Sequence, residues 1–133
     1  MKVMIDTNII ISAVLFPGGK ASSAMFKALL PPFKPLISDL ILSELHQKFQ
    51  EKFPADQPKL DAFFEYALPV IQIVDTPRVP VKSELNIRDI KDRPILRAAL
   101  ASDADYYLTG DKDFLESGVA EPRIISASDF LLI

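Results

Sequence analysis

Short, continuously apolar segments alternate with segments of helical periodicity along the whole chain. Branched and aromatic residues dominate the apolar segments, which is typical of buried strands. The predicted strands are 2–5, 36–37, 70–74, 106–109 and 123–126. Helices are predicted over 9–16, 22–30, 39–53, 56–68, 95–100 and 112–116, and a capping box at Ser126 begins a last helical turn. Residues 76–88 carry two prolines without periodicity and are predicted to be a loop.

Helices that separate continuously apolar strands indicate a parallel sheet covered on both faces, the α/β class. A chain of 133 residues can bury one core and hardly two. No repeat, low-complexity tract or linker divides it. We therefore expect a single domain over residues 1–133.

The composition excludes several classes of protein. With 49% hydrophobic and 25% charged residues, the chain is not intrinsically disordered. The lack of cysteine excludes disulfides, a thiol nucleophile and cysteine-ligated metals. No apolar run approaches the roughly 18 residues of a membrane span, and Asp6 interrupts any signal-like start. We expect a soluble cytoplasmic protein with no membrane association.

The net charge is −3, from 15 Lys and Arg against 18 Asp and Glu. This balance argues against a protein that holds nucleic acid by bulk positive charge. It is compatible with a metal-dependent nuclease, whose acidic site is neutralised by its cations.

Acidic residues stand where the predicted strands end. Asp6 follows the first strand, and Asp111 follows the fourth with only Gly110 between. Asp92 begins the helix that precedes the fourth strand, and Glu44 lies at the edge of the apolar stripe of helix 39–53. Ligand sites of parallel sheets lie at the carboxyl ends of the strands. If the first and fourth strands are neighbours, these four carboxylates converge, and they need cations such as Mg²⁺ or Mn²⁺ between them.

The order of these motifs resembles the PIN-domain nucleases. The chain has Asp6-Thr7-Asn8 after the first strand, Glu44 in a mid-chain helix, Asp92 ahead of an alanine-rich helix, and Thr109-Gly110-Asp111-Lys112-Asp113-Phe114. Each motif is weak alone, but four in this order, over nearly the whole chain, are a specific signal. Within the family, the chain looks most like the toxins of prokaryotic toxin–antitoxin pairs, namely the VapC-like group and the related branch of small toxins. The resemblance implies a three-layer fold with a central parallel sheet of about five strands flanked by helices.

The resemblance also implies a set of site residues. The metal-binding and catalytic acids would be Asp6, Glu44, Asp92 and Asp111. Asp113 would be an additional or substitute metal ligand, and Asn8 and Thr109 would orient the carboxylates. Asp89, three residues before Asp92, can share its face, and the sequence leaves open which of the two is the inner ligand. We prefer Asp92 because it stands at the helix start.

The activity that the resemblance implies is hydrolysis of single-stranded RNA by metal-activated water, without a covalent intermediate. The implied partners are the RNA substrate, an antitoxin protein and a second copy of the chain in a homodimer. Five basic residues are available for the RNA backbone, although each also fits an ordinary solvated charge: Lys20, Lys91, Arg93, Arg97 and Lys112.

Other interpretations fit less well. A non-catalytic PIN-like module that binds RNA or protein is the main alternative, and the complete set of acids counts against it. A haloacid-dehalogenase-type phosphatase would need an aspartate where the chain has Asn8, and the features of a receiver domain are absent. His46, the only histidine, falls among polar positions, which makes histidine-based metal binding or catalysis improbable. The phenylalanines of the two middle helices are expected in the core: Phe49, Phe53, Phe63 and Phe64.

Overall fold

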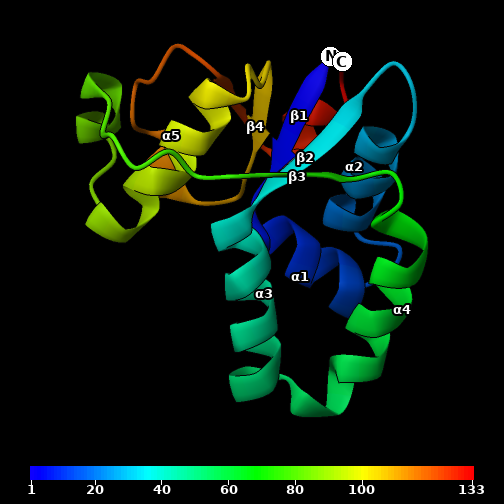
Figure 1. Cartoon of the computed structure of the whole chain (residues 1–133). Helices are drawn as coiled ribbons and strands as arrows, with labels where there is room; N and C mark the ends of the chain where they lie inside the picture. The colour runs from blue at the N-terminus through cyan, green and yellow to red at the C-terminus, as the bar shows by residue number, and fades with distance from the viewer.

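A parallel sheet of five strands runs through the centre of the computed structural model, which describes residues 1–133 (Figure 1). The strands are β1 (Lys2–Ile5), β2 (Lys34–Ser38), β3 (Gln72–Val74), β4 (Tyr106–Leu108) and β5 (Arg123–Ile125). Their order across the sheet is β3-β2-β1-β4-β5, and every neighbouring pair is parallel. The chain therefore builds outward from β1 on one side, then returns to build on the other. The adjacency of the first and fourth strands on which the site prediction depends is confirmed.

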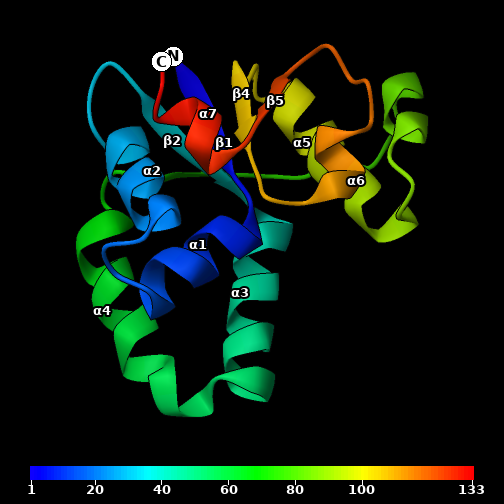
Figure 2. The ribbon, with the colours of Figure 1, turned by 180° about the vertical axis from the view of Figure 1, so that it is seen from behind.

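Seven α-helices flank the sheet, and α5 and α7 lie on opposite sides of it (Figures 1 and 2). The helices are α1 (Thr7–Leu15), α2 (Lys20–Leu29), α3 (Asp39–Lys52), α4 (Gln57–Ala67), α5 (Arg93–Ala101), α6 (Lys112–Leu115) and α7 (Ala127–Phe130). Three 3-10 helices complete the chain: η1 (Pro54–Asp56), η2 (Lys82–Asn86) and η3 (Ile90–Asp92). The three-layer α/β fold with a five-stranded parallel sheet is confirmed.

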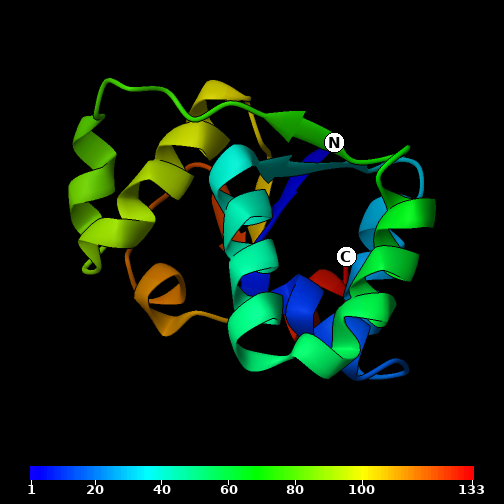
Figure 3. The same cartoon turned by 60° about the horizontal axis from the view of Figure 1, so that its bottom comes forward.

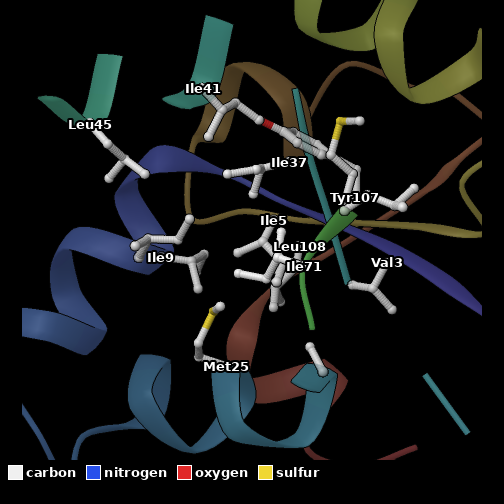
Figure 4. Packing of buried hydrophobic residues seen from close by; sticks show 14 of the residues in the cluster. Val3, Ile5, Ile9, Met25, Ile37, Ile41, Leu45, Ile71, Tyr107 and Leu108 are labelled. Carbon is white, nitrogen blue, oxygen red and sulfur yellow. The ribbon is translucent and has the colours of Figure 1, made fainter. Parts of the chain in front are cut away.

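The core is one cluster of 30 buried hydrophobic residues. Strand β1 lies at its centre, because Val3, Met4 and Ile5 are fully buried. Figure 4 shows side chains of the sheet, such as Ile5 and Leu108, packed beside those of the flanking helices. The middle-helix phenylalanines lie where the sequence predicts: Phe49, Phe63 and Phe64 belong to the core, and Phe53 packs against it.

Helices α3 and α4 form an antiparallel pair that extends beyond the carboxyl ends of the strands (Figures 1 and 3). Helix α3 begins directly at the end of β2, where the hydroxyl of Ser38 accepts a hydrogen bond of 3.2 Å from the amide of Ile41. This is the N-cap that the sequence predicts. One face of α3 is thereby held beside the carboxyl end of β1.

The segment 76–88 is not the simple loop that the sequence predicts, because it contains η2. Glu84 orders this segment and is only 4% exposed. Its carboxylate accepts hydrogen bonds from the amide of Val81 (2.7 Å) and from two guanidinium nitrogens of Arg97 on α5 (3.0 and 2.8 Å). Those bonds from Arg97 hold the pKa of Glu84 below its usual value. The contact spans 13 residues, so local periodicity gives no sign of it.

Strand β3 also differs from the prediction. It begins at Gln72, because the amides of Val70 and Ile71 donate back to the carbonyl of Ala67 and close a turn after α4. Gln72 and Ile73 are exposed at the edge of the sheet. The expectation that every strand is covered on both faces is therefore wrong for β3.

No single helix is long and apolar enough to cross a membrane. Helices α1 and α2 pass that test only as a pair, with a bend of 112° between them.

Candidate metal centre

A cavity of about 400 Å³ opens at the carboxyl ends of β1 and β4, and none of its lining residues is hydrophobic. The four predicted acids enter it from four separate segments: the end of β1, helix α3, the end of η3 and the end of β4. The predicted residue Asn8 and the second candidate Asp89 also line it. The full lining is Asp6, Asn8, Glu44, Gln47, Lys48, Glu51, Lys52, Asp89, Lys91, Asp92 and Asp111.

Asp6 is the buried acid of the cavity, with only 5% of its surface exposed. It is the N-cap of α1, and its carboxylate accepts hydrogen bonds from the amide of Thr7 (2.7 Å) and the hydroxyl of Thr109 (2.6 Å). Its own amide donates to the carbonyl of Leu108, which ties the end of β1 to β4. Burial raises the pKa of Asp6, and the bonds from Thr109 and Thr7 act in the opposite direction.

Thr109 connects two of the acids. Besides donating to Asp6, its hydroxyl oxygen accepts a hydrogen bond of 3.0 Å from the amide of Asp111. The carboxylate of Asp111 in turn caps α6 by accepting from the amide of Asp113 (2.9 Å). The Thr109 side chain is fully buried and fixes both acids relative to β4. The predicted orienting role of Thr109 fits this geometry.

Asp92 differs from Asp89 in burial and in hydrogen bonding. Asp89 is exposed and caps η3 by accepting from the amide of Lys91 (3.0 Å). Asp92 is half-buried and stands at the N-cap of α5, where Pro94 lies in the first turn, but its side chain makes no capping bond. Its carboxylate oxygens are therefore not engaged in capping, and this fits the prediction that prefers Asp92 over Asp89 as the inner ligand.

The pKa of Asp92 is raised from its ordinary value of 3.8 to about 6. Burial is the largest cause, followed by the negative charges of Asp89, Asp111, Asp6 and Glu44. Carboxylates crowded in this way are stabilised as anions by a bound cation.

Asp113 lies at the rim of the site. Oxygen atoms of Asp92, Asp111 and Asp113 all lie within 4.8 Å of one another, close enough for one ion to touch all three. Asp113 is also paired with Arg88, whose guanidinium nitrogen lies 2.7 Å from it and 3.5 Å from Glu116. A metal ion would have to share Asp113 with this arginine or displace it.

Helix α3 contributes more residues than the sequence analysis named. Glu44 forms an ion pair with Lys48 one turn later (3.3 Å), and Gln47, Glu51 and Lys52 line the same cavity. Their spacing of three, four, seven and eight residues from Glu44 places them on one helix face. That spacing is a signal in the sequence that could have found them.

Tyr107 on β4 is a further residue that sequence reasoning missed. It is 1% exposed, and its hydroxyl lies beside the carboxylate of Asp6 without a hydrogen bond of regular geometry. Burial, and then the negative charges of Asp6, Asp92 and Glu44, raise its pKa well above 10. A buried donor beside carboxylates, without a regular hydrogen bond, fits a site that is completed by bound water. Together with an all-oxygen set of acids, it suits a hard divalent cation.

Residues 2–113 of the sequence match the family model that describes the PIN domain. The chain belongs to the PIN domain family. None of the curated proteins matches it in sequence.

Solved structures share the fold of this PIN domain. It aligns with a chain of the VapBC2 structure from Rickettsia felis, bound to a DNA fragment from its promoter, with a TM-score of 0.70 and 20% identity over 95% of this chain and 98% of that one. A chain of a toxin–antitoxin complex from Klebsiella pneumoniae aligns with a TM-score of 0.63 and 23% identity, over 94% of this chain and 97% of that one. A chain of FitAcB from Neisseria gonorrhoeae aligns with a TM-score of 0.67 and 18% identity, over 95% of this chain and 98% of that one.

The remaining predicted positions of this PIN domain lie in different surroundings. His46 is exposed, as expected, with its ring centre 5.7 Å from that of Phe64. Among the basic residues, Lys91 lines the acidic cavity, while Lys20 donates to the hydroxyl of Ser128. Lys112 is exposed, and Arg93 and Arg97 line a neighbouring cavity.

Proposed function

We propose that this PIN domain is a metal-dependent ribonuclease that hydrolyses phosphodiester bonds of single-stranded RNA with Mg²⁺ or Mn²⁺. The observation that carries the proposal is the meeting of four acids, from four separate segments, in one polar cavity at the sheet's carboxyl edge. A structural role alone gives no reason to gather charges that raise the pKa of Asp92 to about 6.

The proposed ligands are Asp6, Glu44, Asp92 and Asp111, with Asp113 as an additional ligand. A divalent cation held by such acids lowers the pKa of a bound water and stabilises negative charge on the phosphate. The chain's own part is to orient the acids, which the hydroxyl of Thr109 does for Asp6 and Asp111. Asn8 borders the same cavity as a second orienting group.

Positive charge around the cavity serves the substrate in this proposal. Lys48, Lys52 and Lys91 line the same cavity as the acids. Their ammonium groups offset part of the repulsion between an acidic site and an anionic RNA strand. The net charge of −3 is therefore compatible with RNA as substrate.

We further propose that the chain is the toxin of a toxin–antitoxin pair and forms a homodimer. One structure with this fold comes from a complex named as a toxin–antitoxin complex. An apolar cavity of about 430 Å³ lies between α1, α2 and α4, next to the stacked and half-exposed rings of Phe26 and Tyr66. Apolar surface of this kind is typical of protein interfaces. Light scattering of the purified protein should give the mass of two chains. Expression of the parent should arrest cell growth, whereas expression of Asp6→Asn should not.

Incubation of the purified protein with mixed single-stranded and structured RNA tests the nuclease. The reactions contain Mn²⁺, Mg²⁺ or EDTA and are repeated with Asp6→Asn, Asp92→Asn and the control Asp75→Asn, which changes an exposed acid outside the cavity. We expect cleavage only with metal, lost in the two site variants and kept in the control.

Two other results would change the proposal. RNA binding without cleavage, together with no rise in melting temperature on adding metal, would favour the non-catalytic binding module. A rise without cleavage would support the metal site and refute this choice of substrate.

A further inference from the structure

A second cavity of about 630 Å³ adjoins the acidic one. η3 and the start of α5 separate the two cavities, because some residues of this segment line one cavity and the others line the second. Asp89, Lys91 and Asp92 line the acidic cavity, whereas Ile90 and Arg93 line the second. The rest of the second lining comes from η2, the residues before it and α5: Pro80, Val81, Lys82, Glu84, Leu85, Pro94 and Arg97.

The second cavity combines unpaired positive charge with exposed apolar side chains. Leu85 is 65% and Ile90 72% exposed, so most of each apolar side chain is open to solvent. Lys82 is exposed and forms no ion pair, and Arg93 uses only its Nε, which donates to the carbonyl of Ile87 (2.9 Å). Arg97 and Glu84 neutralise each other. The lining therefore carries two free cations beside an apolar surface.

The shape of the cavity is set before any ligand binds. The pair of Arg97 and Glu84 fastens η2 to α5 through two hydrogen bonds, and Arg97 also donates to the carbonyl of Pro77 (2.9 Å). Glu84 is almost fully buried in this arrangement. A preformed cavity lowers the ordering cost of binding.

We propose that the second cavity binds the nucleotide that flanks the cleaved phosphate of single-stranded RNA. Its phosphate would contact Lys82 and Arg93, and its base would lie on Leu85 and Ile90. The inference rests on the proposed function, because a phosphate in the acidic cavity requires the continuous strand to leave across a neighbouring surface. A nucleotide joins an anionic group to an apolar face, which is the combination this lining matches. An acidic amphipathic peptide has similar chemistry, but only RNA must pass from one cavity to the other.

Two variants test the site: Lys82→Glu and Ile90→Ser. Their matched controls are Lys34→Glu and Leu132→Ser, which alter an exposed lysine at the start of β2 and an 83% exposed leucine near the C-terminus. Cleavage kinetics with a labelled RNA hexanucleotide and a dinucleotide give KM and kcat. Fluorescence anisotropy in the Asp6→Asn background measures hexanucleotide binding without cleavage, and melting curves check that each variant folds.

We expect Lys82→Glu to weaken hexanucleotide binding about tenfold and to lower the slope of log affinity against log salt by about 1. Ile90→Ser should weaken binding about fivefold, because an apolar contact is lost. Both variants should raise KM for the hexanucleotide and leave kcat unchanged. The ratio of kcat/KM for the hexanucleotide to that for the dinucleotide should therefore fall. The two control variants should match the parent.

Three results would overturn the inference. If the parent cuts RNA and the two variants behave like their controls, the second cavity plays no part and the proposed function stands. If the parent neither binds nor cuts RNA, the proposed function itself fails, and this inference with it. If an acidic amphipathic peptide binds in a way that depends on Lys82 and Ile90 while RNA binding does not, the cavity is a protein-docking site.

Discussion

Replacing Asp92 with asparagine should stabilise the metal-free protein above neutral pH. The pKa of Asp92 is about 6 in the folded protein, against an ordinary value of 3.8. Between those two values the folded state binds more protons than the unfolded state, so its stability falls as the pH rises. The loss begins near pH 4 and is complete above about pH 7. Asparagine keeps the shape of the side chain without the charge, so the Asp92→Asn variant should lack this loss.

The magnitude follows from the interval between the two pKa values. The interval is roughly two pH units, and each unit corresponds to about 1.4 kcal/mol. The unfolding free energy lost when Asp92 ionises is therefore at most about 3 kcal/mol. Asp92 is only half-buried, and solvent screening reduces this to about 1 kcal/mol. For a domain of this size, the variant should melt about 3 to 5 °C above the parent at pH 7.5, with no such difference at pH 4.

Thermal melts followed by circular dichroism in EDTA, from pH 4 to 8, measure this difference. Asp75→Asn serves as the control, because it removes an exposed acid outside the cavity. Adding Mn²⁺ should reverse the order at pH 7.5, since the parent gains stability from the bound ion and the variant gains less. A variant that melts at or below the parent temperature at pH 7.5 without metal would refute the reasoning from crowded carboxylates.

Three further predictions concern the rim, the buried hydroxyl and the core. Arg88→Ala frees the carboxylate of Asp113 and removes a nearby positive charge, so calorimetry should show Mn²⁺ binding about two- to fivefold tighter; unchanged affinity would mean that Asp113 lies outside the site. Thr109→Val should lower the unfolding free energy by about 1 to 3 kcal/mol and remove most of the cleavage activity, because the buried carboxylate of Asp6 loses its hydroxyl donor. Thr109→Ser keeps the hydroxyl and should keep the stability and activity of the parent in the same urea titrations and cleavage assays. Phe49→Ala should lower the unfolding free energy by about 3 to 5 kcal/mol in urea titrations, since Phe49 is fully buried, and a loss below about 1 kcal/mol would contradict its place in the core.

The sequence is informative wherever the signal is local. A few neighbouring residues are enough to predict the strand before Asp6, the cap at Ser38 and the proline in the first turn of α5. Such signals depend on side chains that contact their own backbone or repeat with the period of one element. The order of elements and the chain positions of the four acids can therefore be predicted, and with them the α/β class.

The sequence signal fails where a contact spans many residues. Nothing near Glu84 indicates that it pairs with Arg97, so the sequence predicts a loop where η2 lies. Similarly, Arg88 gives no local sign of its pairing with Asp113. The exposed edge position of β3 follows from the order of the strands rather than from its own residues.

The sequence by itself determined which acids follow which elements and left two candidates, Asp89 and Asp92, for the inner position. Only the tertiary structure distinguishes their surroundings, because Asp92 is half-buried among Asp89 and acids from other segments, whereas Asp89 is exposed. It likewise placed the buried hydroxyl of Tyr107 beside Asp6 and a second, basic cavity beside the acidic one. The physical reason is that electrostatic and packing energies depend on distances in space, which the folded sheet sets between residues up to about a hundred positions apart.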